Sequence, residues 1–227
     1  MAVRAVGPVV SPKAVLFDMD GVIVNSEDFW VELETEEILP AAVEGQAVSE
    51  GEITGINYRE IYDYLDERYE VAVDREEWLE YYESAAEEVY TEKVDLMPGF
   101  RDLLADLHDR GLRVAVVSSS PHEWIGMVTE RFGLDGEFDT VISADDVDAD
   151  SKPEPDVYEH AAREVGVDAA DCIAVKDSKN GVKSAKAAGM TAIGYRTETN
   201  AEMDLTEADG VVDGAEKLRS ELLSRTA

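Results

Sequence analysis

The sequence Lys13-Ala-Val-Leu-Phe17, followed directly by Asp18-Met-Asp20-Gly21, carries the most information about the fold class. A short apolar run of this kind is typical of a buried strand, and the polar tetrapeptide after it is typical of a loop. Short β-branched runs recur only much later in the chain, with helical patterns between them. The later runs are Arg113–Val117, Thr140–Ser143, Cys172–Val175, Thr191–Gly194 and, as a candidate sixth strand, Gly210–Val212. Strands that alternate with helices predict an α/β fold, a Rossmann-like parallel sheet with helices on both faces.

Residues 25–94 interrupt this alternation. They contain no convincing strand, and their apolar side chains recur at helical spacing around Phe29–Leu39, Tyr58–Tyr69 and Glu76–Tyr90. We therefore expect two domains, a core made of residues 1–24 and 95–227 and an inserted α-helical cap made of residues 25–94.

Acidic residues dominate the composition, with 52 Asp and Glu against 20 Lys and Arg and a net charge of −32 at pH 7. Nucleic acids and anionic membranes carry the same sign, so we expect neither as a partner. The acids are spread along the whole chain, which indicates a halophilic protein adapted to molar intracellular salt. A single cysteine, Cys172, fits a reducing compartment. With no recognisable leader or membrane span, we expect a cytoplasmic protein without an obligate protein partner.

Polar side chains follow four of the predicted strands, at the edge of a parallel sheet where ligands bind. They are Asp18 and Asp20, then Ser118–Ser120, then Lys152, then Asp177. Converging carboxylates repel one another unless a cation lies between them, and oxygen ligands suit Mg²⁺. Hydroxyls, backbone N–H groups and a lysine beside that ion suit a phosphoryl group. The pattern therefore predicts phosphoryl transfer through an aspartyl-phosphate.

The motifs Asp18-Met-Asp20-Gly-Val, Val117-Ser118, Lys152-Pro-Glu-Pro-Asp and Asp177-Ser-Lys-Asn-Gly occur in the order typical of one family. In nearly its whole length the chain resembles the haloacid dehalogenase (HAD) superfamily, and most of all its β-phosphoglucomutase and phosphoglycolate phosphatase group. The resemblance implies a set of roles: Asp18 as nucleophile, Asp20 as acid and base, Ser118, Ser119 and Lys152 as phosphate ligands, and Asp18, Asp20 and Asp177 as ligands of a Mg²⁺ cofactor. It also implies that the cap closes over the substrate.

The cap residues expected to face the substrate are Ser26, Trp30, Asn57, Tyr58 and Arg59. In β-phosphoglucomutase a histidine stands in the place of Trp30, and an arginine near the place of Tyr58 grips a second phosphate. Tryptophan cannot shuttle a proton in that way, and Arg59 is one position off. These departures favour a phosphatase of small phosphorylated metabolites, with a phosphohexomutase as the alternative.

Lys176 is the main departure from the family pattern, because an acidic residue that commonly binds the metal is expected there. At an effective dielectric constant of about 20, a like charge about 4 Å from the ion costs on the order of 4 kcal/mol. Three interpretations remain. Lys176 turns away from the metal, or Mg²⁺ binds weakly, or the chain is a non-catalytic module that binds phosphorylated metabolites.

Overall fold

The computed structural model describes residues 11–43, 45–48, 50–53, 56–147 and 153–226. Lys152 lies outside these residues, so its predicted contact with phosphate stays a prediction. Among the described residues, no helix combines the length and the apolar character needed to cross a bilayer.

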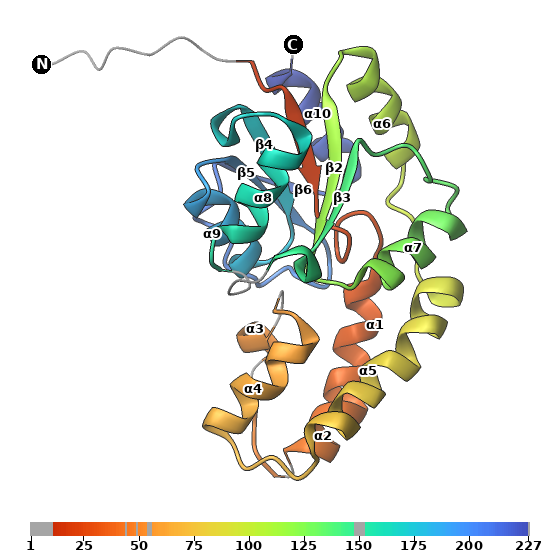
Figure 1. The fold of residues 1–227 in the computed structure, drawn as a ribbon, viewed down its shortest axis with the longest axis vertical. Coiled ribbons are helices and arrows are strands. Elements are labelled where there is room, and N and C mark those ends of the chain that lie inside the picture. Colours follow the sequence, from red (N-terminus) through yellow and green to blue (C-terminus); the bar gives the residue numbers. More distant parts are fainter. Residues whose placement is uncertain (1–10, 44, 49, 54–55, 148–152, 227) are drawn as a thin grey trace, which may run out of the picture.

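A six-stranded sheet, parallel throughout, forms the centre of the core. Its strands are β1 (Ala14–Phe17), β2 (Arg113–Ser118), β3 (Thr140–Ser143), β4 (Cys172–Lys176), β5 (Thr191–Arg196) and β6 (Gly210–Asp213). Their spatial order is β3-β2-β1-β4-β5-β6, and Figure 1 shows helices on both faces. The predicted Rossmann-like fold, including its sixth strand, is confirmed.

Alternate residues of the strands point into two separate apolar layers. One layer joins the sheet to α6 (Phe100–Asp109), α7 (His122–Arg131) and α10 (Ala215–Arg225). The opposite layer joins it to α8 (Asp156–Val165) and α9 (Lys179–Ala187). Because helices cover both faces, β1 is fully buried and reads as an uninterrupted apolar run. Two short 3₁₀ turns, Ala144–Asp146 and Ala169–Asp171, complete the core.

The helices between Ser26 and Lys93 gather below one end of the sheet (Figure 1). They are α1 (Ser26–Leu33), α2 (Leu39–Ala42), α3 (Glu50–Ile53), α4 (Tyr58–Arg68) and α5 (Arg75–Glu88), with wider π-helical turns at Glu34–Ile38 and Val89–Lys93. Trp78 and Leu65 are fully buried among them. We call this group of helices the cap; its predicted bounds at residues 25 and 94 stay a prediction.

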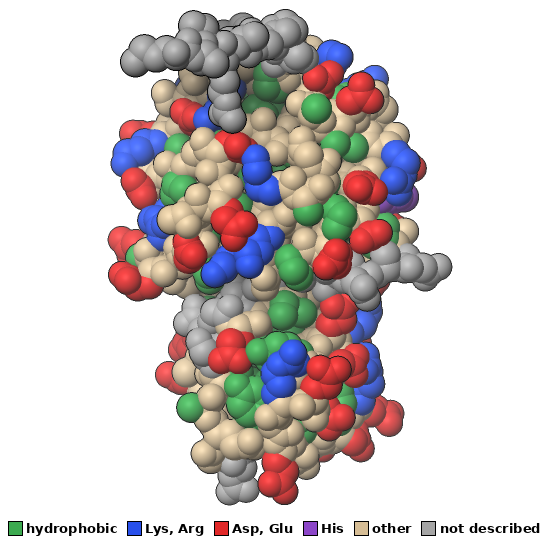
Figure 2. Space-filling view, turned by 90° about the vertical axis from the view of Figure 1, so that its left-hand side faces the viewer, with side chains coloured by type: hydrophobic (Ala, Val, Ile, Leu, Met, Phe, Trp, Pro, Cys, Tyr) green, Lys and Arg blue, Asp and Glu red, His purple; other side chains and the backbone are tan. Residues whose placement is uncertain are grey.

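On the face drawn in Figure 2, the acidic side chains are dispersed rather than gathered in one patch. Figure 2 shows them on both the core and the cap, interspersed with fewer basic groups. This distribution agrees with the even spread of acids along the sequence.

Strand register brings the loops of the site together. β1 lies between β2 and β4, with Phe17 paired to both Val116 and Val175. The loop after β1 turns at Gly21, whose φ of +67° lies in the left-handed region that favours glycine. A Cβ atom at Gly21 would collide with the carboxylate of Asp177, which follows β4. The absence of a side chain at Gly21 thus allows these two loops to meet.

We expect Gly21→Ala to destabilise the protein more than Gly136→Ala. Both glycines have positive φ, but a Cβ at Gly136 meets no atom within 4 Å. Each substitution should cost about 1 kcal/mol for its backbone, and displacement of Asp177 should add roughly 1–3 kcal/mol at Gly21 alone. Thermal unfolding in molar KCl measures the difference, and equal losses in the two variants would contradict the close approach.

Candidate active site

Asp18 is the first residue after β1 and lies at the carboxyl edge of the sheet. Its side chain is nearly buried, with 7% of the residue exposed. The backbone N–H of Asp18 donates to the carbonyl of Val175 at 3.2 Å, and its Oδ1 accepts from the N–H of Met19 at 3.0 Å. These contacts fix the carboxylate at the mouth of a pocket that lies between the core and the cap.

Lys176 is the last residue of β4, and its fully buried ammonium forms an ion pair with Oδ2 of Asp18. Lys176 therefore points toward the site, next to Asp18. The physical reason is strand register, because β4 runs beside β1 and places Lys176 next to Asp18. Burial lowers the pKa of Lys176 from its ordinary value, whereas the charge of Asp177 favours the ammonium form.

Asp177 lines the same pocket as Asp18 and Asp20. Its residue is 5% exposed, and its carboxylate lies over the backbone of Gly21. The side-chain amide of Asn200 donates to the carbonyl of Asp177 at 2.8 Å and to that of Tyr195 at 2.9 Å. The structure thus brings together the three carboxylates singled out in the sequence. Asn200, which holds the loop of Asp177, was missed because no motif marks it.

The serine loop after β2 places its three hydroxyl groups in different surroundings. Ser118 is fully buried, and its hydroxyl accepts from the backbone N–H of Ser120 at 3.0 Å. Ser143 at the end of β3 donates to the carbonyl of Ser120 at 2.8 Å. Ser119 and Ser120 line the pocket instead. Ser118 therefore shapes the loop from beneath, and its predicted contact with phosphate stays untested.

Asp20 accepts hydrogen bonds from three hydroxyl groups. Ser26 and Tyr90 donate to Oδ1 at 2.5 and 2.8 Å, and Ser120 donates to Oδ2 at 2.7 Å. The indole N–H of Trp30 donates to the Tyr90 hydroxyl at 3.0 Å. Burial and the charge of Asp20 raise the pKa of Tyr90 well above its usual range, so its hydroxyl stays neutral and can donate. The cap thereby positions the side chain expected to act as acid and base.

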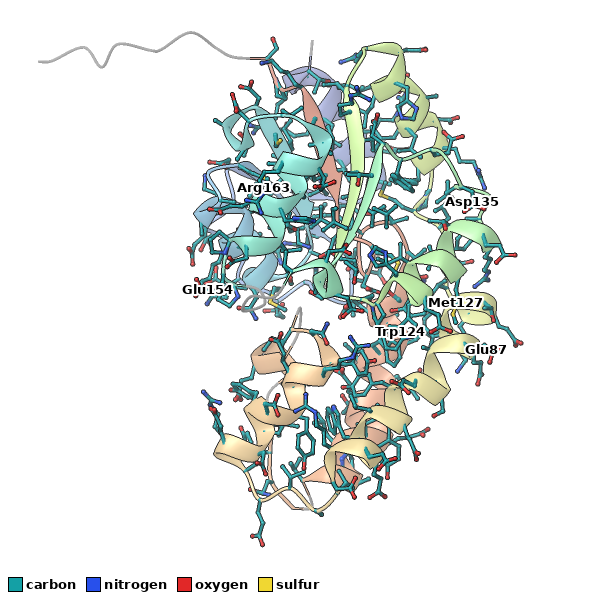
Figure 3. The ribbon with its side chains drawn as sticks, viewed as in Figure 1. Glu87, Trp124, Met127, Asp135, Glu154 and Arg163 are labelled. Atoms are coloured by element: carbon teal, nitrogen blue, oxygen red, sulfur yellow. The ribbon has the colours of Figure 1, made fainter. Side chains whose placement is uncertain are left out.

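Aromatic rings from both the cap and the core line the pocket. Trp124 of α7 stacks on Trp30 and on Tyr58, with ring centroids 5.6 and 4.8 Å apart. Trp30 also stacks on Tyr82 at 5.4 Å. Figure 3 shows Trp124 where α7 meets the cap helices. The sequence singled out Trp30 and Tyr58, but Tyr82, Tyr90 and Trp124 were missed because their spacing resembles that of ordinary core residues.

Asn57 and Arg59 connect the cap to the core. Asn57 caps α4 by accepting from the N–H of Arg59 at 3.0 Å, and its amide donates to the carbonyl of Ser119 at 2.8 Å. The guanidinium of Arg59 pairs with Asp145 at 2.5 Å, and Arg59 is not among the side chains that line the pocket. In this closed arrangement Arg59 holds the cap against the core instead of reaching toward a substrate.

The carboxylates of the site do not fit a divalent cation in this arrangement. Oδ2 of Asp18, one of the predicted metal ligands, is engaged by the ammonium of Lys176. Within the described ranges, no three acidic, histidine or cysteine side chains are grouped as a metal site would require. Asp18, Asp20 and Asp177 share a pocket, but a lysine lies where the charge of a metal ion would be expected.

A family model described as haloacid dehalogenase-like hydrolase matches residues 15–195. The chain belongs to this family. Hexitol phosphatase B of Escherichia coli (strain K12) is 33% identical over 192 residues, which cover 79% of this chain and 82% of that relative. β-Phosphoglucomutase of Bacillus subtilis (strain 168) is 27% identical over 195 residues, which cover 80% of this chain and 82% of that relative.

A solved structure confirms the fold independently. The crystal structure of CbbY from Rhodobacter sphaeroides in complex with phosphate has a TM-score of 0.73 at 24% identity, over 88% of this chain and 93% of that chain. The predicted superfamily, the Rossmann-like fold and the hydrolase class are therefore confirmed.

We expect Tyr90→Phe to lower the phosphatase activity proposed below about tenfold, because Asp20 would lose one of three hydrogen bonds to a charged group. The matched control is Tyr81→Phe on α5, whose hydroxyl makes no hydrogen bond to another described residue. Steady-state kinetics in molar KCl compare the two variants, with circular dichroism to verify folding. Equal activities in the two variants would remove Tyr90 from the positioning of Asp20.

Proposed function

We propose that this chain is a phosphatase that hydrolyses monoesters of small phosphorylated metabolites through an aspartyl-phosphate on Asp18. The observation that carries the proposal is the convergence of Asp18, Asp20 and the Ser119–Ser120 turn on one pocket beneath the cap. A nearly buried carboxylate at a strand end, with an acid and base beside it, is suited to covalent phosphoryl transfer. The family and its named phosphatase relative add support.

In the first step, a carboxylate oxygen of Asp18 attacks phosphorus and the ester P–O bond breaks. Asp20 gives its proton to the leaving oxygen, so that the alcohol departs neutral. In the second step, Asp20 takes a proton from a water molecule, whose oxygen bonds to phosphorus as the P–O bond to Asp18 breaks. Inorganic phosphate leaves, Asp18 is again a free carboxylate and Asp20 is again protonated. The hydroxyls around Asp20 can donate or accept, so the same network can hold its charged and its protonated form.

The family resemblance implies a Mg²⁺ cofactor, with Asp18, Asp20 and Asp177 as its ligands. When bound, such an ion would neutralise charge on the phosphoryl oxygens. None of the steps above is routed through it, because the Lys176 ammonium engages the Asp18 carboxylate in this arrangement.

The pocket favours a neutral leaving group over one that carries a second phosphate. Its described lining includes aromatic rings and the carboxylates of Glu27 and Glu34, and contains no lysine or arginine. Aromatic faces pack against the C–H surfaces of a sugar or polyol, and carboxylates accept hydrogen bonds from its hydroxyl groups. Carboxylates would repel a second phosphate. A sugar or polyol monophosphate therefore fits this pocket better than a hexose bisphosphate, which a phosphohexomutase must hold.

We expect a screen in molar KCl to find turnover of sugar and polyol monophosphates, with slower turnover of the corresponding bisphosphates. Asp18→Asn should lower that activity by at least about 1000-fold, because it removes the nucleophile. Asp102→Asn, at an exposed position of α6, is the matched control and should leave activity unchanged. Release of inorganic phosphate measures both effects.

Two outcomes would contradict the proposal. Binding of phosphate esters without turnover would favour the non-catalytic module. Net interconversion of hexose monophosphates would favour the phosphohexomutase.

A further inference from the structure

We propose that the ammonium of Lys176 is a built-in cation that takes the place of a divalent metal beside Asp18, so that this enzyme works without Mg²⁺. The role of Lys176 in the reaction rests on the proposed phosphatase function. Whether Lys176 excludes the metal can be tested without measuring turnover. The inference rests on the ion pair between Lys176 and Asp18 and on the fit of the lysine side chain into the fold.

The Lys176 side chain fits into a space that its neighbours in the fold leave open. It leaves the end of β4 and passes the backbone of Gly181 in α9. A Cβ atom at Gly181 would collide with Cε of Lys176 and would lie 3.2 Å from Nζ. The glycine therefore leaves the space that the lysine fills. A lysine accommodated in this way, and fully buried, is part of the core and not a surface side chain that happens to point inward.

Tyr158 of α8 bounds this space on another side. Its ring is fully buried, and its centroid lies 5.7 Å from the Lys176 ammonium. An aromatic face within about 6 Å attracts a cation. The ring and the Gly181 backbone keep the ammonium away from solvent, next to Asp18.

The positive charge of Lys176 disfavours the binding of a divalent cation at this site. The ion pair places the positive charge of Lys176 directly beside the carboxylate of Asp18 at the sheet edge. A metal ion between the carboxylates of Asp18 and Asp177 would be repelled by the ammonium at close range, in surroundings of low dielectric. This repulsion should weaken Mg²⁺ binding by at least about 100-fold relative to a chain with an acidic residue at position 176.

The same ammonium can perform part of the chemistry that a metal would supply. Next to Asp18, its positive charge favours the ionised nucleophile. As phosphorus bonds to Asp18, negative charge develops on the phosphoryl oxygens beside the carboxylate with which this fixed cation pairs. Lys176 transfers no proton in this scheme, since Asp20 exchanges protons with the leaving group and with water. The lysine therefore acts only through its charge, and the bonds and protons exchanged in the two steps stay the same.

The experiment measures Mg²⁺ binding and activity separately, on the whole chain in molar KCl. Isothermal titration calorimetry compares the wild type with Lys176→Glu, which restores an acid, and with Lys183→Glu, the same charge change on an exposed face of α9. We expect no resolvable site in the wild type or in Lys183→Glu, and a single Mg²⁺ site in Lys176→Glu. A site of equal affinity in the wild type and in Lys176→Glu would overturn the proposal.

Activity in excess EDTA supplies the second measurement. The wild type should be as active in EDTA as in Mg²⁺, whereas Lys176→Met, an unbranched side chain one atom shorter and without charge, should lose at least about 100-fold in EDTA. Wild-type activity that disappears in EDTA and returns with Mg²⁺ would overturn the inference while leaving the phosphatase proposal intact.

A wild type that turns over no phosphate ester in either condition would refute the phosphatase proposal, and the calorimetry would still decide whether Lys176 excludes the metal. If Lys176→Glu does not fold, two measurements decide whether Lys176 takes the place of the metal. They are the Mg²⁺ titration of the wild type and the activity of Lys176→Met in EDTA.

Discussion

The site depends on one ion pair, between the carboxylate of Asp18 and the ammonium of Lys176. Both groups lie at the ends of adjacent parallel strands, where Lys176 is fully buried and only 7% of Asp18 is exposed. A buried charge is tolerated only when a partner of opposite sign compensates it, and removal of one partner leaves the other uncompensated. Glycines at positions 21 and 181 provide the space, one for the carboxylate of Asp177 and one for the lysine. The pair therefore constrains β1, β4 and the loops that follow them.

A second constraint lies in the cap, which contributes hydroxyls to Asp20 as well as the wall of the pocket. Ser26 and Tyr90 belong to the cap, whereas Ser120 belongs to the core, so Asp20 is fully held only when the two parts meet. The Arg59–Asp145 ion pair between them is about one-third exposed, and salt screens such pairs. The stacked rings around Trp124 do not depend on charge. Closure that rests mainly on aromatic packing should therefore depend little on ionic strength, in a chain whose net charge is −32.

The strands and the polar residues that follow them could be predicted because buried parallel strands are short apolar runs and their loops converge on one edge. Asp18, Asp20 and Asp177 do share a pocket. The direction in which Lys176 points could not be predicted, since alternation along β4 leaves the last residue free to face either the site or the solvent. The roles of Tyr90 and Trp124 could not be predicted for a different reason, because their spacing in helices is that of core residues. The inward turn of the Ser118 hydroxyl depends on Ser120 and Ser143, which only the folded loops bring near it.

The most direct test of the account is a crystal structure of the wild-type protein grown with Mg²⁺ and an oxyanion that mimics phosphate. The account predicts the oxyanion beside Asp18, with the Lys176 nitrogen within about 3 Å of the Asp18 carboxylate and no metal between Asp18 and Asp177. An octahedral ion with oxygen ligands at about 2.1 Å, bound to Asp18 and Asp177 with Lys176 displaced, would contradict it.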